Sequence, residues 1–175
     1  MSVESVEREH IVSMRVENRS GVLARVAGLF SGRGYNIESL TVAPTLDPTI
    51  SMMTIVTKGD DLIIEQILKQ LNKLVEAISV VDLTERAYID RDMAIIKVKT
   101  TLETRAEVFR IAEIFRARVI DSTNTMYTLE VTGTGRKIEA MIYQLESLGI
   151  EELVRAGHIA VAREPYGADT DRRSE

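Results

Sequence analysis

The chain has 175 residues, of which 45% are hydrophobic and 28% charged, so it is long enough for one large or two small globular domains. It contains no cysteine, which excludes disulfides, thiolate metal sites and a cysteine nucleophile, and its two histidines, His10 and His158, lie too far apart in sequence to suggest a His-rich metal centre. A net charge of -5 and an aromatic content of 5% without tryptophan argue against nucleic acid or an anionic membrane as a partner. Because the first ten residues are acidic and no apolar run approaches the roughly 20 residues that span a bilayer, we expect a cytoplasmic protein.

The first half of the chain alternates between strand and helix patterns. Residues 10–17 alternate so that Val12, Met14 and Val16 share one face, as in a strand with one buried side. Leu46-Asp47-Pro48 is a turn signal between two β-branched runs and predicts a hairpin. The expected elements are a strand at 10–17, a helix at 21–33 ending before Gly34, strands at 36–45 and 49–57, a helix capped by Asp60, and a strand at 76–83.

The second half repeats this order without repeating the sequence. Thr104 and Glu107 have the spacing of a capping box before an apolar helical stripe, and a later stripe ends at Gly149. The expected elements are a strand at 93–100, a helix after Thr104, strands at 119–122 and 127–131, a helix ending at Gly149, and a strand around 159–162.

These patterns predict an α+β protein of two tandem ferredoxin-like βαββαβ domains. We expect an N-terminal tail at 1–9, a first domain at 10–86, a second at 87–163, and a charged flexible tail at 164–175. In the first domain the strand at 49–57 is apolar on both faces, although two helices cover only one face of such a sheet. We therefore expect another protein chain, or a second copy of this one, to cover the other face.

The segment from Asn18 to Asn36 carries the best candidate for a binding site. Gly21 opens the first helix, where the amides of Gly21, Val22 and Leu23 have no helical partners and can bind a small anion. Asn36, before the next strand, can donate to a carboxylate or accept from an ammonium group. These residues could hold both charged ends of a free amino acid. They also fit an ordinary helix start, and on the segment alone that is the simpler interpretation.

A longer block of sequence carries a resemblance to a known family. The stretch SGVLARVAGLFSGRGYNIESLTVAPTLDPTISMMTI strongly resembles the regulatory small subunit of acetolactate synthase, also called acetohydroxyacid synthase. The likeness covers about residues 10–163 and is most specific in GLFSGRGYNIESLTVAPT, which general amino-acid-binding domains do not share. It implies that the first domain is an ACT domain and that this chain regulates a separate catalytic subunit.

The resemblance also implies a site and a set of partners. ACT domains of this family pair as a homodimer and bind valine, or another branched-chain amino acid, at the seam between two copies. Carried over by position, the site comprises Asn18, Gly21, Val22 and Leu23 of one chain with Asn36 and Ile37 of the other. The helix amides would hold the carboxylate, Asn36 the ammonium group, and Val22, Leu23 and Ile37 the isopropyl group.

The same resemblance assigns the cofactors to the catalytic subunit. Thiamine diphosphate, Mg²⁺ and FAD would bind there, and no cofactor, metal or catalytic residue is expected on this chain. One residue departs from the family pattern: Met52 stands where an arginine is frequent. The change leaves the expected amino-acid site intact but removes any contact that such an arginine makes to the catalytic subunit.

Two other functions fit the same element order. An acylphosphatase-like hydrolase would use Arg19 and Asn36 to hold an acyl phosphate, although the loop otherwise lacks that family's pattern. An RNA-binding module needs aromatic residues in its first and third strands, and here both lack them. The segment Thr132-Gly133-Thr134-Gly135-Arg136 could cradle a phosphate, but it matches neither the P-loop nor the dinucleotide fingerprint, and a tight turn before a capped helix explains it. His158 has no partner motif and an ordinary structural explanation.

Overall fold

The computed structural model describes residues 8–163, so the expected tails lie outside the described residues except for Arg8 and Glu9, which belong to the first strand. Contacts divide the described chain into two compact units. One comprises residues 8–89 together with 159–163, and the other comprises residues 90–158. No helix among the described residues has the length and apolarity that crossing a membrane requires.

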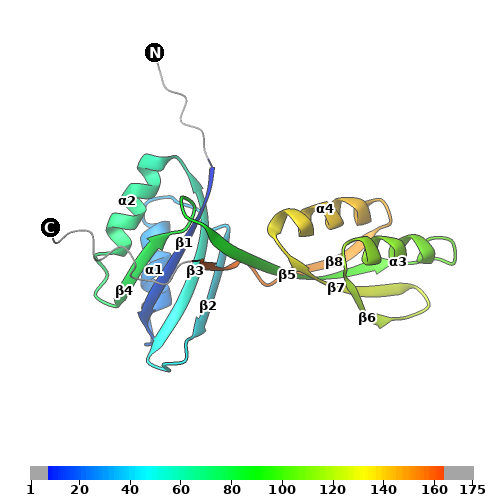
Figure 1. Ribbon diagram of the computed structural model, residues 1–175, viewed down its shortest axis with the longest axis horizontal. Helices are drawn as coiled ribbons and strands as arrows, with labels where there is room; N and C mark the ends of the chain where they lie inside the picture. The colour runs from blue at the N-terminus through cyan, green and yellow to red at the C-terminus, as the bar shows by residue number, and fades with distance from the viewer. Residues whose placement is uncertain (1–7, 164–175) are drawn as a thin grey trace, which may run out of the picture. The chain divides into compact units, whose positions relative to one another are not determined.

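The first unit confirms the βαββαβ order expected for the first half of the chain (Figure 1). Its antiparallel sheet has the strand order β2-β3-β1-β4, and the two helices pack on one face. The Asp60 cap is confirmed, because its carboxylate accepts the amide hydrogen of Ile63 at 2.8 Å. The elements are β1 (Arg8–Glu17), α1 (Val22–Ser31), β2 (Ser39–Pro44), β3 (Ile50–Gly59), α2 (Asp61–Leu71) and β4 (Ala77–Asp82).

Alternation along the strands determines which face of this sheet the helices cover. Val12, Met14 and Val16 of β1 point to the helices and form one core with the apolar stripes of α1 and α2. The intervening side chains, including Ile11 and Glu17, therefore lie on the opposite face of the sheet.

The second unit has the same layered architecture. Its sheet has the strand order β6-β7-β5-β8, and α3 and α4 contribute buried residues to its core. The two units together confirm the expected α+β class with two ferredoxin-like domains. The elements are β5 (Tyr88–Lys99), α3 (Arg105–Ile114), β6 (Arg118–Ser122), β7 (Met126–Gly133), α4 (Gly135–Glu146) and β8 (Ile150–Arg155).

The fourth strand of the second sheet differs from the expected one. β8, which the sequence patterns did not predict, pairs with β5, whereas the expected final strand, β9 (Ile159–Ala162), lies outside the main path of this sheet. Five of the six residues of β8 are exposed, so the strand lacks the hydrophobic alternation that reveals a half-buried strand.

The expected capping box at the start of α3 was wrong. The Thr104 side chain makes no cap hydrogen bond to the helix, and its hydroxyl instead accepts the Thr101 amide hydrogen at 2.9 Å. The Glu107 carboxylate pairs with Arg110 one turn later. Local side-chain contacts, such as those of Thr104 with Thr101 and of Glu107 with Arg110, compete with the hydrogen bonds of a capping box.

The open face of the first sheet is partly covered by the chain itself. Ile11, Val56 and Leu83 form a buried cluster, against which Tyr88, Ala160 and Ala162 pack. The Ala160 amide also approaches the Thr54 hydroxyl at 3.4 Å. The expectation that a separate chain must cover this whole face is therefore corrected: β9 and the start of β5 cover part of it.

Candidate functional site

Asn18 lies at the end of β1 and is fastened to the loop between β2 and β3. Its backbone amide donates to the Thr49 carbonyl at 2.7 Å, and its side-chain amide donates to the Pro48 carbonyl at 2.8 Å. The side-chain carbonyl oxygen remains available as an acceptor. Two hydrogen bonds from one residue therefore join the start of the expected site to the hairpin loop.

Gly21 begins α1 in a conformation that favours glycine. Its φ of 86° lies in the left-handed region, and it is the N-cap of the helix without any side-chain cap. A Cβ added at this position would meet no atom within 4 Å. The space beside Gly21 is therefore open, and an anion that reaches it would be favoured by the positive end of the helix.

Val22 and Leu23 follow Gly21 but differ in exposure. Val22 is 4% exposed and packs in the core with Val26 and Phe30, so its backbone rather than its side chain is available at the surface. Leu23 is 42% exposed and can contact a ligand directly. Of this pair, only Leu23 presents the aliphatic surface that was expected of both.

Asn36 and Ile37 lie in the connection between α1 and β2. The backbone carbonyl of Asn36 accepts a hydrogen bond from the Thr57 hydroxyl at 2.7 Å. The exposed side-chain amide of Asn36 donates to the Glu38 carboxylate at 2.8 Å. Ile37 packs partly against the core of the first unit. The Asn36 side chain is therefore oriented by local contacts and remains accessible.

The two halves of the expected site lie at opposite ends of the first unit. Asn18 is hydrogen-bonded to Thr49, just before β3, whereas Asn36 is hydrogen-bonded to Thr57, near the end of β3. At roughly 3.3 Å per residue, about 25 Å of strand separates these two anchors. One copy of the chain therefore does not bring Asn18 and Asn36 together.

A cavity of about 450 Å³ lies directly beside Asn18. It is bordered by the Glu17–Arg19 ion pair, whose closest atoms, Oε2 and Nε, are 3.1 Å apart. The remaining lining residues are Pro48, Thr49, Ile50 and Ile78. No local sequence pattern reveals this cavity, because its walls come from three separated segments of the chain.

The loop beside this cavity is held by a compact set of hydrogen bonds. The Asp47 carboxylate accepts from the Thr49 hydroxyl at 2.6 Å and from the Thr49 amide at 2.9 Å. These two bonds hold the pKa of Asp47 below its ordinary value of 3.8. The loop that carries Pro48 and Thr49 is therefore well defined next to Asn18.

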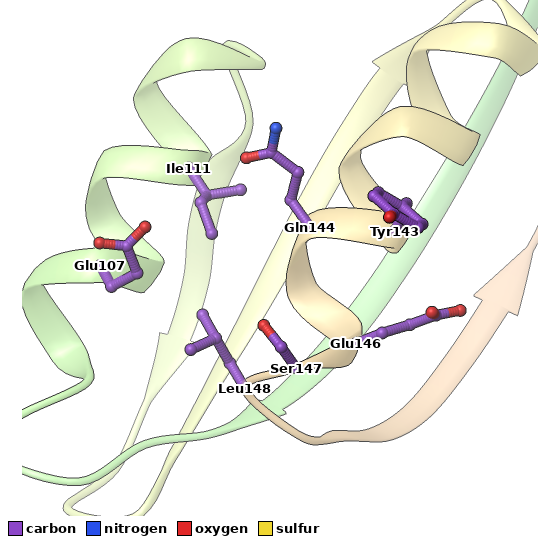
Figure 2. Close-up of a pocket in the computed structure, with 7 residues that line it drawn as sticks. All are labelled: Glu107, Ile111, Tyr143, Gln144, Glu146, Ser147 and Leu148. Atoms are coloured by element: carbon purple, nitrogen blue, oxygen red, sulfur yellow. The ribbon is translucent and has the colours of Figure 1, made fainter.

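A second cavity, of about 670 Å³, lies between α3 and α4 in the second unit. Figure 2 shows Glu107 and Ile111 on α3 facing Gln144 on α4 and Leu148 just beyond it. Its lining includes two carboxylates, Glu107 and Glu146, and no basic residue. This cavity therefore offers no counter-charge for an anionic ligand.

The arrangement does not support the alternative chemistries. Arg19 lies at the Asn18 end of the first unit, so a single chain does not bring it to Asn36 around one acyl phosphate. Within residues 8–163 no cluster of three or more His, Asp or Glu side chains could hold a metal ion. The strands β1 and β3, which an RNA-binding module would use for base stacking, contain no aromatic residue.

Comparison with known families matches both units of the chain. Residues 12–79 match the small subunit-like ACT domain of acetohydroxyacid synthase, and residues 91–164 match the domain described as the small subunit of acetolactate synthase. The two family matches thus fall one on each half of the chain.

Individual relatives agree with these matches. The acetolactate synthase small subunit of Aquifex aeolicus is 49% identical over 158 residues, which are 90% of this chain and 82% of that protein. The isozyme 3 small subunit of Escherichia coli is 47% identical over 154 residues, 87% of this chain and 94% of that protein. The crystal structure of the small subunit from Thermotoga maritima is 43% identical, with a TM-score of 0.81 over 90% of this chain and 99% of that one.

The sequence resemblance to this family is therefore confirmed along nearly the whole chain, with the ACT domain in the first half. The chain belongs to the family of acetolactate synthase small subunits, which are the regulatory, non-catalytic partners of a separate catalytic subunit.

Proposed function

We propose that this small subunit activates the catalytic subunit of acetolactate synthase and makes it sensitive to inhibition by valine. The effector, valine or another branched-chain amino acid, binds at the seam between two copies of the ACT domain. The family establishes the catalytic partner and the ACT domain, and the geometry of the first unit supports the location of the effector.

The separation of Asn18 from Asn36 is the observation that carries this proposal. Each residue is exposed, and each lies at a different end of the same unit. A two-fold axis that relates two copies can bring opposite ends together and forms two equivalent sites. The residues of the expected site therefore suit a ligand that is shared between copies.

The edge strand β2 offers a surface for such pairing. It pairs only with β3 in the sheet path, and Val42, Ala43 and Pro44 are exposed along it. Antiparallel pairing of two β2 edges would place the beginning of one strand opposite the end of the other. The Asn36 connection of one copy would then approach the loop to which Asn18 of the other copy is bonded.

At this seam each group has a defined task. The free amides at Gly21 and Leu23 receive the carboxylate, and the side-chain carbonyl of Asn36 accepts from the ammonium group. Leu23 and the partner's Ile37 contact the isopropyl group, while buried Val22 shapes the helix end. Thiamine diphosphate, Mg²⁺ and FAD belong to the catalytic subunit in this proposal.

The proposal is tested with the full chain and its catalytic subunit. Adding the chain should raise the rate of acetolactate formation, and valine should then lower that rate by roughly five-fold to a hundred-fold. Asn36→Ala should weaken the inhibition and reduce the heat of valine binding measured by calorimetry. Asn72→Ala, at an exposed asparagine that bonds only within its own helix end, is the matched control.

Two results would contradict the proposal. One is an equal response of the Asn36→Ala protein and the wild type to valine, leucine and isoleucine. The other is a strictly monomeric chain by analytical ultracentrifugation in the presence of saturating valine, because a monomer cannot assemble the shared site.

A further inference from the structure

The cavity beside Asn18 contains the chemistry that recognises a free aliphatic amino acid within a single chain. We propose that it is a second amino-acid site, present once in every chain, which shares Asn18 with the seam between copies but is otherwise lined by different residues. This inference extends the proposed function, because it concerns the same class of effector, but it needs no residue from a partner.

The charged rim of the cavity matches the two ends of a zwitterion. Arg19 supplies a guanidinium group for a carboxylate, and Glu17 supplies a carboxylate for an ammonium group. In the structure these groups pair with each other, with side chains that are 73% and 37% exposed. An ion pair this exposed contributes little to stability, so a zwitterion can replace it by pairing with each partner.

The walls of the cavity suit an aliphatic side chain. Ile50 lies directly across from Glu17 in the pairing of β1 with β3, and Ile78 approaches from the start of β4. Ile78 is 49% exposed, and Pro48 also lines the cavity. Burying such apolar surface against a hydrocarbon group favours binding and selects against polar amino acids.

The position of the cavity on the sheet leaves it open. Glu17 and Ile50 lie on the face of the first sheet opposite its helices. The cover from β9 and Tyr88 lies over Ile11, Val56 and Leu83, toward the other end of the strands. The chain therefore covers one end of this face with its own residues, while the other end carries the cavity.

The volume and lining distinguish this cavity from the one between α3 and α4. At about 450 Å³ it falls in the range of small-molecule sites. It combines both signs of charge with aliphatic walls, whereas the larger cavity has carboxylates alone among its charged residues. Of these two cavities, the one beside Asn18 is therefore the one complementary to a zwitterion.

Asn18 connects the two sites. Its side-chain amide holds the Pro48 carbonyl at the rim of the cavity, and the turn after it leads directly into Gly21 at the seam. A ligand that moves the Pro48 loop acts on the hydrogen bond that positions Asn18. The two sites are therefore expected to influence each other's affinity.

The test is the stoichiometry of binding of valine, leucine and isoleucine to the full chain, measured by calorimetry. We expect two amino acids per chain for the wild type. Arg19→Gln and Ile78→Asp should each lower the affinity of the cavity for the amino acid by about tenfold or more, while the seam still binds it. Asn36→Ala should have the complementary effect, which is to lower the affinity of the seam and leave the cavity able to bind.

Leu62→Asp provides the matched control for Ile78→Asp. Leu62 is also an exposed aliphatic residue of the first unit, but it lies in the first turn of α2, which follows the opposite end of β3. Both substitutions add a carboxylate at an exposed position, so both proteins should fold.

The methyl signals of Ile50 and Ile78 in NMR spectra should shift on adding leucine to the Asn36→Ala protein.

The possible outcomes separate this inference from the proposed function. If Arg19→Gln and Ile78→Asp bind as the wild type does, or if Asn36→Ala abolishes all binding, the second site does not exist. If Asn36→Ala changes nothing while Arg19→Gln removes all binding, the cavity is supported and the seam is not. Absence of binding of all three amino acids to the wild type overturns both.

Discussion

Two glycines near the same helix allow a direct test of how the effector site begins. Gly21 has a φ of 86° at the N-cap of α1, whereas Gly28 lies within α1, and an added Cβ would meet no atom within 4 Å at either position. The same change to alanine therefore adds a methyl group without a clash in both cases. Only the backbone conformation distinguishes them.

The expected free-energy changes have opposite signs. Gly21→Ala forces an L-residue into the left-handed region and should destabilise the first unit by about 1–2 kcal/mol. Gly28→Ala removes the entropic cost of a helical glycine and should stabilise it by about 0.5–1 kcal/mol. The two variants should therefore differ by about 1.5–3 kcal/mol. Since 1 kcal/mol corresponds to roughly 2–4 °C at this chain length, their melting temperatures should differ by about 3–12 °C.

Thermal and urea unfolding, followed by calorimetry with valine, measure both consequences. The methyl group at residue 21 would project into the space assigned to the ligand carboxylate, so valine affinity should fall by about tenfold for Gly21→Ala and stay unchanged for Gly28→Ala. Shifts of equal sign and size in the two variants would refute the argument from backbone conformation. Unchanged valine affinity in Gly21→Ala would refute the placement of the carboxylate.

Three further predictions address the rest of the structure. Arg155→Ala should destabilise the second unit by roughly 2–4 kcal/mol in urea unfolding, because it removes the guanidinium that donates to the buried Asp92 carboxylate at 2.9 Å. The pKa of Asp47 measured by NMR should lie below 3.8, and Thr49→Ala should raise it. Because the pKa of Asp47 is lower in the folded than in the unfolded state, its carboxylate stabilises the fold above the unfolded pKa. This stabilisation is lost as the pH falls through the folded pKa. Leu83→Ala should cost about 2–4 kcal/mol, because Leu83 is fully buried in the cluster that β9 covers.

Each of these has a contrary result. A small loss of stability on removing Arg155 would mean that water replaces the guanidinium at the carboxylate. A midpoint for Asp47 at or above 3.8 would show that the Thr49 hydrogen bonds do not persist in solution. A negligible cost at Leu83 would indicate that the cover by β9 does not hold.

The sequence by itself determined the element order of the first unit, the buried faces of its strands and helices, and the family. The spacing of hydrophobic residues within a segment depends on that segment alone. The alternation in β1 and the apolar stripe in α2 therefore each predict one element and its buried side. The Asp60 cap is confirmed by its hydrogen bond to Ile63, whereas the Thr104 cap, which spans the same three residues, was wrong because the Thr104 hydroxyl bonds to Thr101 instead. The block from Gly28 to Thr45 carried the family, and the relatives confirm it.

Tertiary structure decided which separated segments meet. β8 has too little burial to show a pattern, so its pairing with β5 was not evident from sequence, and β9 covers the first unit because of a contact with residues far away in the chain. The cavity beside Asn18 likewise joins the ends of β1, β3 and β4. Long-range pairings depend on packing and on closing the intervening loops, and neither leaves a periodic signal in a single segment.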